Sequence, residues 1–225
     1  MSLPVAQTQA TTGLTLKGSA VVIKDYLLFA INSIFFQRDI YSPNEFKMVN
    51  KYGLPLMVME DNSSLKYILE DAEKAISAKG LKKVILAIFE KGTDSVIEKW
   101  EFEISTDRSE ENNNNQMGSK NITLVQAEIR AVLKQVLGSV SYLPIIEPGS
   151  RFRFIFVCEV GFSLPGWTTY HGSLDVNNSE EFIFKEFSTS LHKCATKKKD
   201  VLSLCVVIRL KEKGDRGIEV SHGVA

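Results

Sequence analysis

Apolar residues between Ser19 and Asp39 fall on nearly every side of a helical projection rather than on one stripe. A helix with that pattern has no solvated face, so the segment predicts a long, central, buried helix with Ser19 as its candidate N-cap. Residues 64–80 instead place apolar side chains three and four positions apart, which predicts an amphipathic helix that ends at Gly80.

Residues 123–140 predict a third helix, with Thr123 as its cap and Gln126 closing a capping box. The apolar stripe of this helix runs through Ile129, Val132, Leu133 and Val136. Lys134 and Gln135 should therefore face at least partly outward.

The segment SPNEFKMVNKYG, residues 42–53, carries another helix-start signature. Ser42 can cap, Pro43 suits the first helical position, and Glu45 can complete a capping box. We expect a helix here, followed by a short strand over residues 54–61.

The strands are marked by side-chain types that alternate with a period of two residues. Residues 82–105 alternate on both sides of a turn supplied by Gly92, which predicts a β-hairpin. Residues 151–160 alternate so that one face is aromatic and the other is mixed, as in a sheet packed on helices. The aromatic face carries Phe152, Phe154, Phe156 and Cys158, and the other face carries Arg153, Ile155 and Val157.

The carboxy-terminal part offers two further strand candidates, residues 182–190 and 201–210, separated by a lysine run that we interpret as a solvated turn. Polar segments without periodicity lie between and outside the predicted elements. We expect a flexible arm over 1–13, a flexible loop over 106–120 and a disordered tail over 212–225.

Composition restricts the class of protein. The 225 residues contain 27 basic and 27 acidic side chains, so no net charge draws the chain to nucleic acid or to an anionic membrane. The first residues lack a secretory signal, and no run reaches the ~18 uncharged apolar residues of a membrane span. Three widely spaced cysteines give no disulfide framework, which favours a reducing compartment and an intracellular soluble protein.

His192 and Cys194 are the main candidates for chemistry, because alternate residues of a strand share one face, as a base and a nucleophile would. No motif supplies a third orienting group or an oxyanion donor, and His171 and His222 lack the spacing of zinc ligands. The sequence also contains no G-x-G-x-x-G and no P-loop. A catalytic or metal-binding role is therefore the weaker alternative, and we expect no cofactor.

Trp167 lies in an irregular segment, where an indole either anchors a partner or pins its own loop to the core. The strand material near the end of the chain also exceeds what one compact sheet needs. A terminal strand pair can join a sheet edge or leave that edge open to a partner's peptide, so the pattern favours β-augmentation over catalysis.

Five blocks of sequence, spread in order over about residues 14–194, resemble the HORMA-domain family. Within that family they resemble the mitotic-arrest-deficient spindle checkpoint branch more than the DNA-repair branch, chiefly through the EKW, SYLP and FSTSLHK motifs. The blocks are LTLKGSAVVIKDYLLFAINSIFFQRDIY, FKMVNKYGLPLMV, IEKWEFEI, QAEIRAVLKQVLGSVSYLP and KEFSTSLHK.

This resemblance implies an α+β fold, with three helices packed on an antiparallel sheet and a mobile C-terminal safety belt over 160–211, within a HORMA domain over 14–211. In the family, the belt changes sheet edge between open and closed conformers and encircles a partner's extended peptide. The implied partners are a kinetochore coiled-coil checkpoint protein and the activator of the anaphase-promoting complex. An open–closed homodimer and a remodelling ATPase with its adaptor are also implied, with no nucleic acid and no membrane, at the nucleus, kinetochore and cytoplasm.

The resemblance also implies roles for individual residues. The peptide-binding positions are Phe152, Arg153, Phe154, Ile155, Phe156, Val157, Cys158 and Trp167. The dimer surface matches Lys134, Gln135 and Tyr142. The switching positions match His192 and Cys194, whose contribution would be strand pairing and packing, and Leu16, which would move during conversion.

The sequence departs from the family pattern at three places. Lys134 stands where the family usually has arginine, and lysine lacks the planar fork that pairs in a bidentate way, so homodimerisation should weaken. Asp39 stands where the family generally has glycine. The segment after Cys194 diverges and runs longer than the usual ending. Two alternatives stay open: a DNA-repair or meiotic HORMA scaffold that binds another peptide, and an enzyme that uses His192 and Cys194.

Overall fold

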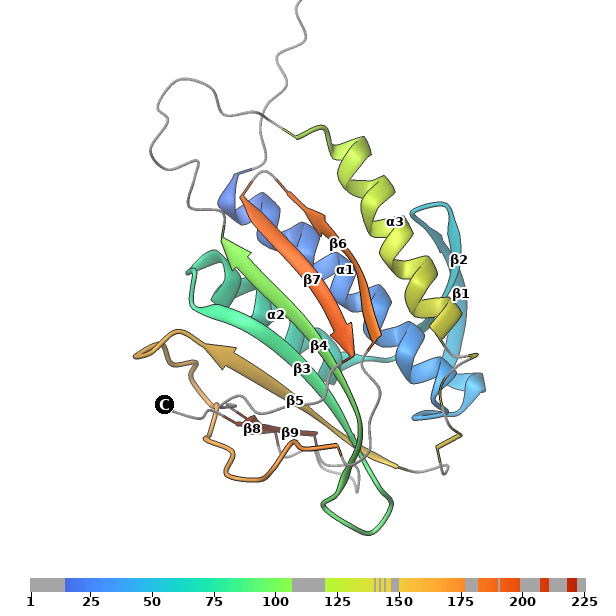
Figure 1. Cartoon of the computed structure of the whole chain (residues 1–225), viewed down its shortest axis with the longest axis vertical. Coiled ribbons are helices and arrows are strands. Elements are labelled where there is room, and N and C mark those ends of the chain that lie inside the picture. Colours follow the sequence, from blue (N-terminus) through green and yellow to red (C-terminus); the bar gives the residue numbers. More distant parts are fainter. Residues whose placement is uncertain are drawn as a thin grey trace, which may run out of the picture.

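A computed structural model describes residues 15–106, 120–139, 141, 143, 145–146, 150–176, 182–189 and 191–198, and the backbone of 207–210 and 218–221. Three helices cover one face of a seven-stranded sheet, and a separate two-stranded hairpin lies beside α1 and α3 (Figure 1). The α+β architecture expected from the sequence is confirmed. In chain order the elements are α1 (Leu16–Gln37), η1 (Pro43–Glu45), β1 (Phe46–Lys51), β2 (Leu54–Met59), α2 (Ser63–Ser77), β3 (Leu81–Phe89), β4 (Val96–Thr106), α3 (Ile122–Ser139), β5 (Arg151–Cys158), β6 (Phe182–Ser188), β7 (His192–Lys198), β8 (Val207–Leu210) and β9 (Ile218–Ser221).

The first helix, α1, is the buried central helix that its apolar surface predicts. It begins one turn before Ser19: Thr15 is the N-cap, and its hydroxyl accepts from the N–H of Gly18 at 3.1 Å. By length and composition alone α1 could cross a membrane, although it contains the charged residues Lys24 and Asp25, and 67% of its most apolar window is buried inside the protein. The hydrophobic surface of α1 is therefore used by the core.

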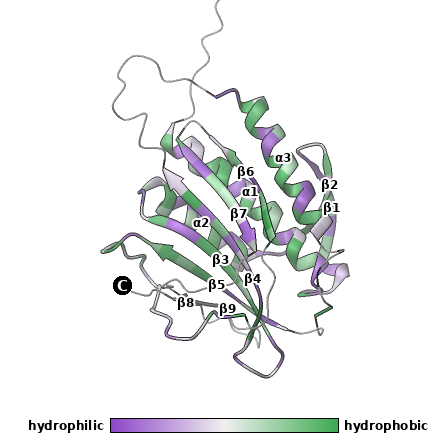
Figure 2. Ribbon diagram, in the orientation of Figure 1, coloured by the Kyte–Doolittle hydropathy of each residue, from purple (hydrophilic) through white to green (hydrophobic). Residues whose placement is uncertain are grey.

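Asparagines cap the other two helices. The side chain of Asn62 accepts from the N–H of Leu65 at the start of α2, and Asn121 accepts from the N–H of Thr123 at the start of α3. The predicted cap at Thr123 is thus wrong by two residues. Along α3, polar and apolar residues alternate around the turns (Figure 2), as its amphipathic pattern predicts.

The helix predicted over residues 42–53 is wrong. Glu45 does accept from the N–H of Ser42 at 2.9 Å, but this local signature closes only the single 3₁₀ turn of η1. The chain then forms the β1–β2 hairpin, because Tyr52 and Gly53 both adopt left-handed backbone angles, φ 51° and 66°, at its two-residue turn.

The large sheet has the strand order β6-β7-β4-β3-β5-β8-β9. The predicted β3–β4 hairpin and the alternating strand β5 are both present, and β5 pairs antiparallel with β3. In β6, a register shift between Ile183 and Glu186 lets Phe184 and Phe187, three positions apart, both reach the core.

Two of the three lysines in the run do not form the turn that we predict, and Lys199 lies outside the described residues. Lys197 and Lys198 belong to β7, a strand that the sequence pattern does not reveal and that pairs with β4 and β6. Of the strand expected over 201–210, only 207–210 lies among the described residues, as β8. The stretch expected as a disordered tail contains β9, while the arm over 1–13 and most of the loop over 106–120 lie outside the described residues.

Candidate functional site

β5 carries the residues expected to bind a peptide, and it lies near one edge of the sheet, with β3 on one side and β8 on the other. Phe152, Phe154 and Phe156 point into the core beneath the helices, where the first two contact Phe35 with ring centroids 4.7 and 6.2 Å apart. Ile155 is buried on the opposite, outer face. Because these side chains are already packed, an added strand would be held first by the backbone edge of β5.

Trp167, whose role the sequence leaves open, is pinned to the helix side of the sheet. Its indole stacks on Phe156 with 4.1 Å between ring centroids, and its Nε1–H donates to Oδ2 of Asp71 on α2 at 2.9 Å. The side chain of Trp167 is only 9% exposed. The indole therefore anchors the segment after β5 to the core.

Three residues further on, Tyr170 lies on the outer face of the sheet. The guanidinium of Arg153 sits 4.6 Å from the ring centroid of Phe89 and 5.5 Å from that of Tyr170, so the cation is held between two aromatic rings. Leu174 is buried in the same outer cluster. The chain thus passes around the β5 side of the sheet between Trp167 and Tyr170. It is held by one aromatic clamp on each face, which are Trp167 on Phe156 at the helix side and Tyr170 on Arg153 at the outer side.

The sequence gives no signal for the outer clamp. Tyr170 stands in an aperiodic stretch, and Arg153 and Phe89 become its partners only when β3 and β5 pair. Val157 and Cys158, the last two of the predicted peptide-binding residues on β5, are half-buried at the end of the strand. Burial raises the pKa of the Cys158 thiol to about 12, so it stays protonated near neutral pH.

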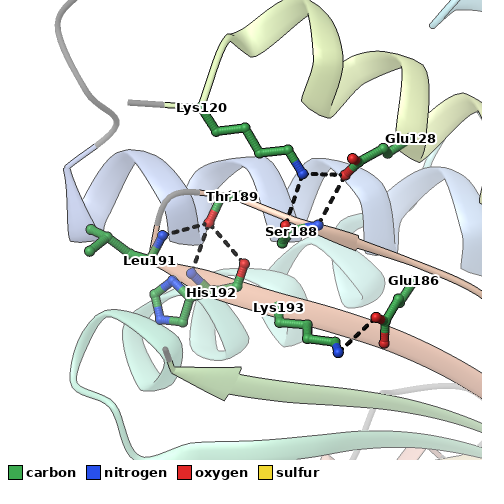
Figure 3. Close-up of polar contacts among 8 residues, drawn as sticks. All are labelled: Lys120, Glu128, Glu186, Ser188, Thr189, Leu191, His192 and Lys193. Atoms are coloured by element: carbon green, nitrogen blue, oxygen red, sulfur yellow. Dashed lines mark hydrogen bonds and ion pairs between the residues drawn. The ribbon is translucent and has the colours of Figure 1, made fainter. Parts of the chain in front are cut away.

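At the opposite side of the sheet, a buried polar cluster ties the β6–β7 turn to α1. Nδ1 of His192 lies 2.7 Å from Oγ of Ser19, which lies 2.5 Å from Oγ1 of Thr189. Thr189 Oγ1 also accepts from the backbone N–H groups of Leu191 and His192 at 3.3 and 2.9 Å (Figure 3). Among the described residues, His192 Nε2 has no hydrogen-bond partner.

The chemistry of His192 and Cys194 argues against a catalytic pair. Burial, and then the charge of Lys79, lower the pKa of His192 to about 4. Burial, and then the charge of Glu103, raise the pKa of the Cys194 thiol, which is 1% exposed. The base is thus weak and the thiol protonated and inaccessible. The residues that the structure describes contain no cluster of three His, Cys, Asp or Glu side chains able to hold a metal.

The third helix caps the outer edge of β6 with side chains. Gln135 Oε1 accepts from the backbone N–H of Lys185 at 2.6 Å. Glu128 Oε2 accepts from the N–H of Ser188 at 3.2 Å and from Nζ of Lys120 at 2.6 Å (Figure 3). Of the predicted dimer residues, Lys134 is exposed and Gln135 is half-buried, as the helical pattern predicts, and Tyr142 lies outside the described residues. Leu16, the third predicted switching position, is half-buried in the first turn of α1.

The EKW motif has a structural role in the core. Glu98 accepts from Nε1 of Trp100 at 2.6 Å and forms an ion pair with Arg38 at 2.8 Å, with 2% and 4% of the two charged side chains exposed. The motif thus joins β4 to the carboxy-terminal end of α1.

Comparison with known proteins agrees with this architecture. Residues 19–153 match the model of the HORMA domain, and the chain therefore belongs to the HORMA-domain family. Within the family it is similar to the mitotic spindle assembly checkpoint protein MAD2A of Homo sapiens, with 31% identity over 86% of this chain and 94% of the relative. It is also 32% identical to the mitotic spindle checkpoint component mad2 of Schizosaccharomyces pombe, over 81% and 91% of the two chains.

Solved structures give the same result. A chain in the crystal structure of the mitotic checkpoint complex superposes with a TM-score of 0.72 at 28% identity, covering 82% of this chain and 99% of that one. C. elegans HTP-2 bound to the HIM-3 closure motif superposes with a TM-score of 0.68, over 82% and 90% of the two chains. Its identity is 12%, so this second likeness shows the fold alone.

Proposed function

We propose that this chain is a non-enzymatic adaptor of the spindle assembly checkpoint that holds an extended peptide against the outer edge of β5. The checkpoint role is supported by the names of its relatives and by the likeness to a chain of the mitotic checkpoint complex. The observation that carries the binding mode is the pair of clamps, Trp167 on one face and Tyr170 on the other. A strand paired with β5 between them would be enclosed by the connecting chain.

The peptide would come from a kinetochore coiled-coil checkpoint protein or from the activator of the anaphase-promoting complex, and its capture would delay anaphase. The chain would act in the nucleus, at kinetochores and in the cytoplasm. A homodimer of open and closed copies would use Lys134, Gln135 and Tyr142, and a remodelling ATPase with its adaptor would reopen the closed form.

The conformational switch would be a movable β6–β7 hairpin. The hairpin is docked on β4 and held to α1 by a few buried polar contacts, chiefly those of Ser19 with Thr189 and His192. The described arrangement, with the hairpin on the β4 side and the belt around β5, would correspond to the closed conformer. Release of the hairpin would free the belt and open the β5 edge.

An alternative is a meiotic or DNA-repair HORMA scaffold that binds a different peptide by the same strand pairing. The fold likeness to HTP-2 bound to a closure motif favours it only at the level of architecture. The identity of the captured partner separates the two functions.

A peptide array tests the proposal. Peptides that tile kinetochore checkpoint proteins, the ubiquitin-ligase activator and meiotic axis proteins are screened against the full chain, and hits are followed by amide hydrogen exchange. We expect a checkpoint peptide to bind and slow exchange across residues 152–158. Binding of meiotic peptides alone would favour the alternative, and hits that leave these amides unprotected would falsify the binding mode.

The clamps can be tested with matched variants. Tyr170→Leu keeps an apolar side chain but loses the contact with the guanidinium of Arg153, a desolvated cation–π interaction of about 2 kcal/mol. We expect the bound peptide to dissociate roughly tenfold faster or more. Tyr170→Phe keeps the ring and loses the two long hydrogen bonds of the hydroxyl, with Arg153 and Ser173 at 3.4 Å, so it should dissociate at close to the wild-type rate.

A further inference from the structure

The chain leaves the sheet at Glu159, the first residue after β5. The N–H of Glu159 donates to the carbonyl of Gly80 at 2.8 Å, which adds one bond to the pairing of β5 with β3. Its carboxylate also forms an ion pair with Lys82 at 2.8 Å, but about half of each side chain is exposed, so this pair contributes little. The start of the belt is therefore held at the junction between α2 and β3.

Two tight turns of the same pattern follow. Each has a glycine in the left-handed conformation at its third position and an aromatic residue at its fourth: φ is 81° at Gly161, before Phe162, and 82° at Gly166, before Trp167. In each turn the N–H of the aromatic residue donates to the carbonyl three positions earlier, at 3.0 and 3.2 Å. The two turns therefore fix the positions of two aromatic rings, five residues apart.

Both rings are fastened to α2 or to its end. Trp167 donates to Asp71 within α2. Phe162 packs against the core at Gly80, just after α2: a Cβ added to Gly80 would stand 2.3–2.5 Å from three carbon atoms of the Phe162 ring. The ring thus lies directly on the backbone of Gly80, so the first part of the belt is attached at two points.

The need for space, rather than for a special backbone angle, explains the glycine at position 80. A helix commonly ends with a glycine in the left-handed conformation, but after α2 that conformation belongs to Lys79, with φ 55°. Gly80 is not left-handed, and its N–H donates to the carbonyl of Ala75 at 2.8 Å. The backbone at position 80 therefore suits alanine, whereas the ring of Phe162 excludes the methyl group.

We propose that Phe162 and Gly80 form a latch, which fixes residues 160–167 of the belt to the α2–β3 junction and sets how long the belt stays closed around β5. The second half of this statement rests on the proposed function. Neither residue is among those expected to bind a peptide. The latch would therefore change the lifetime of a complex without changing the contacts of the peptide.

The first test opens the latch with one methyl group. In Gly80→Ala, we expect the amide of Phe162 to exchange about tenfold faster than in wild type, because the ring must leave its place on residue 80. Gly138→Ala is the matched control, because it adds the same group where no atom beyond its own helix turn lies within 4 Å, and it should leave that amide unchanged. Equal exchange in wild type and Gly80→Ala would overturn the proposal. An equal acceleration of the β4 amides would also overturn it, because position 80 would then support the whole fold.

The second test shows whether the methyl group acts through the ring. Phe162→Ala removes the ring, so adding Gly80→Ala to this variant places the methyl group in the space that the ring has left. The amide at position 162 should then exchange at the same rate in Phe162→Ala and in the double variant. A further tenfold increase in the double variant would show that position 80 acts through other contacts, which would overturn the latch.

A checkpoint peptide identified in the array gives the functional readout. It should dissociate about tenfold faster from Gly80→Ala than from wild type or Gly138→Ala, because the belt opens more often. Equal dissociation rates would overturn the control of the belt by the latch. If no checkpoint peptide binds any of these proteins while the exchange difference persists, the proposed function and the effect on a peptide both fail, whereas the latch itself stands.

Discussion

The hydroxyl of Tyr26 lies 2.6 Å from Oγ1 of Thr196, which joins the middle of α1 to β7 inside the core. Seven residues earlier on the helix and four earlier on the strand, Ser19 meets His192. Seven helical residues rise about 10.5 Å and four strand residues about 13 Å, so the two contacts can repeat along elements that run in the same direction. β7 is thus positioned on α1 by two buried polar links rather than by apolar packing alone.

Removal of one partner of the Tyr26–Thr196 pair should cost more than removal of both. Tyr26→Phe or Thr196→Val each leaves a buried hydroxyl without its partner, which should lower the free energy of unfolding by about 1–3 kcal/mol. The double variant Tyr26→Phe/Thr196→Val should lose less than the sum of the two single losses. Urea unfolding of the four proteins measures the coupling, and strictly additive losses would show that the hydroxyls do not interact.

The pKa of His192 predicts a loss of stability in mild acid. Burial, and then the charge of Lys79, lower this pKa from 6.5 to about 4. Between those pH values the unfolded chain binds a proton that the folded chain does not, so the free energy of unfolding falls as the pH drops through this window. The full loss is about 3 kcal/mol. Urea unfolding from pH 7 to pH 4 should show a shallower decline for His192→Gln; identical slopes would contradict the prediction.

The buried ion pair between Arg38 and Glu98 predicts the largest single effect. Glu98→Gln should retain an acceptor for the indole N–H of Trp100 but leave the guanidinium without its counter-charge, at a cost of about 3–5 kcal/mol. In Arg38→Met/Glu98→Gln both charges are gone, and most of the loss should be recovered. Thermal unfolding compares the three proteins. A double variant that is no more stable than Glu98→Gln would mean that the lost charge is not the cause.

The elements that the sequence predicts well are those whose signal is local. The all-round apolar surface of α1 and the alternation of β5 need no knowledge of partners, and both elements fold as expected. By contrast, β7 reads HKCATKK, and its inward residues His192, Cys194 and Thr196 do not form an apolar stripe. Two of them can be buried because residues about 170 positions earlier bind their polar atoms: Ser19 hydrogen-bonds to Nδ1 of His192, and Tyr26 to Oγ1 of Thr196.

The same reasoning explains the other differences. The capping signature at residues 42–45 is satisfied by a single turn, so it does not determine the structure of residues 46–53. The clamp on Tyr170 depends on a pairing between strands some 65 residues apart, which no local pattern encodes. The strand pattern points to the terminal strands, whereas family likeness is what assigns the peptide-binding role to β5.

Asp39, which stands where the family generally has glycine, is a position where a substitution should stabilise the protein. Asp39 comes directly after the C-cap of α1 with φ 49°, a left-handed conformation that suits glycine, and its carboxylate stands near the negative end of the helix dipole. Asp39→Gly should raise the free energy of unfolding by about 1 kcal/mol. Asp39→Asn should gain less, and Asp39→Ala, which keeps the backbone strain, should gain least. A rank order with alanine above glycine in thermal unfolding would contradict this interpretation.

Contacts between α3 and the edge strand β6 predict how the amides of β6 are protected from hydrogen exchange. Gln135 Oε1 accepts from the N–H of Lys185 at 2.6 Å, so the edge of β6 pairs with a side chain instead of a further strand. Gln135→Leu should speed exchange of the Lys185 amide about fivefold, because about 1 kcal/mol of hydrogen bonding is lost. Lys134→Gln changes the exposed neighbour and should leave that amide unaffected.

Gln135 also lies on the surface proposed for dimerisation. The same pair of variants therefore distinguishes a Gln135 contact within one chain from a Gln135 contact between two copies. If Gln135→Leu speeds hydrogen exchange of the Lys185 amide in dilute protein, where only monomers are present, the contact lies within one chain. The Gln135 side chain is then free to contact a second copy only when β6 has moved away from α3. Movement of the β6–β7 hairpin would thereby change the surface that α3 offers for dimerisation. If Gln135→Leu speeds exchange of the Lys185 amide only at high protein concentration, the hydrogen bond forms between two copies. The position of the hairpin would then not control the dimer surface.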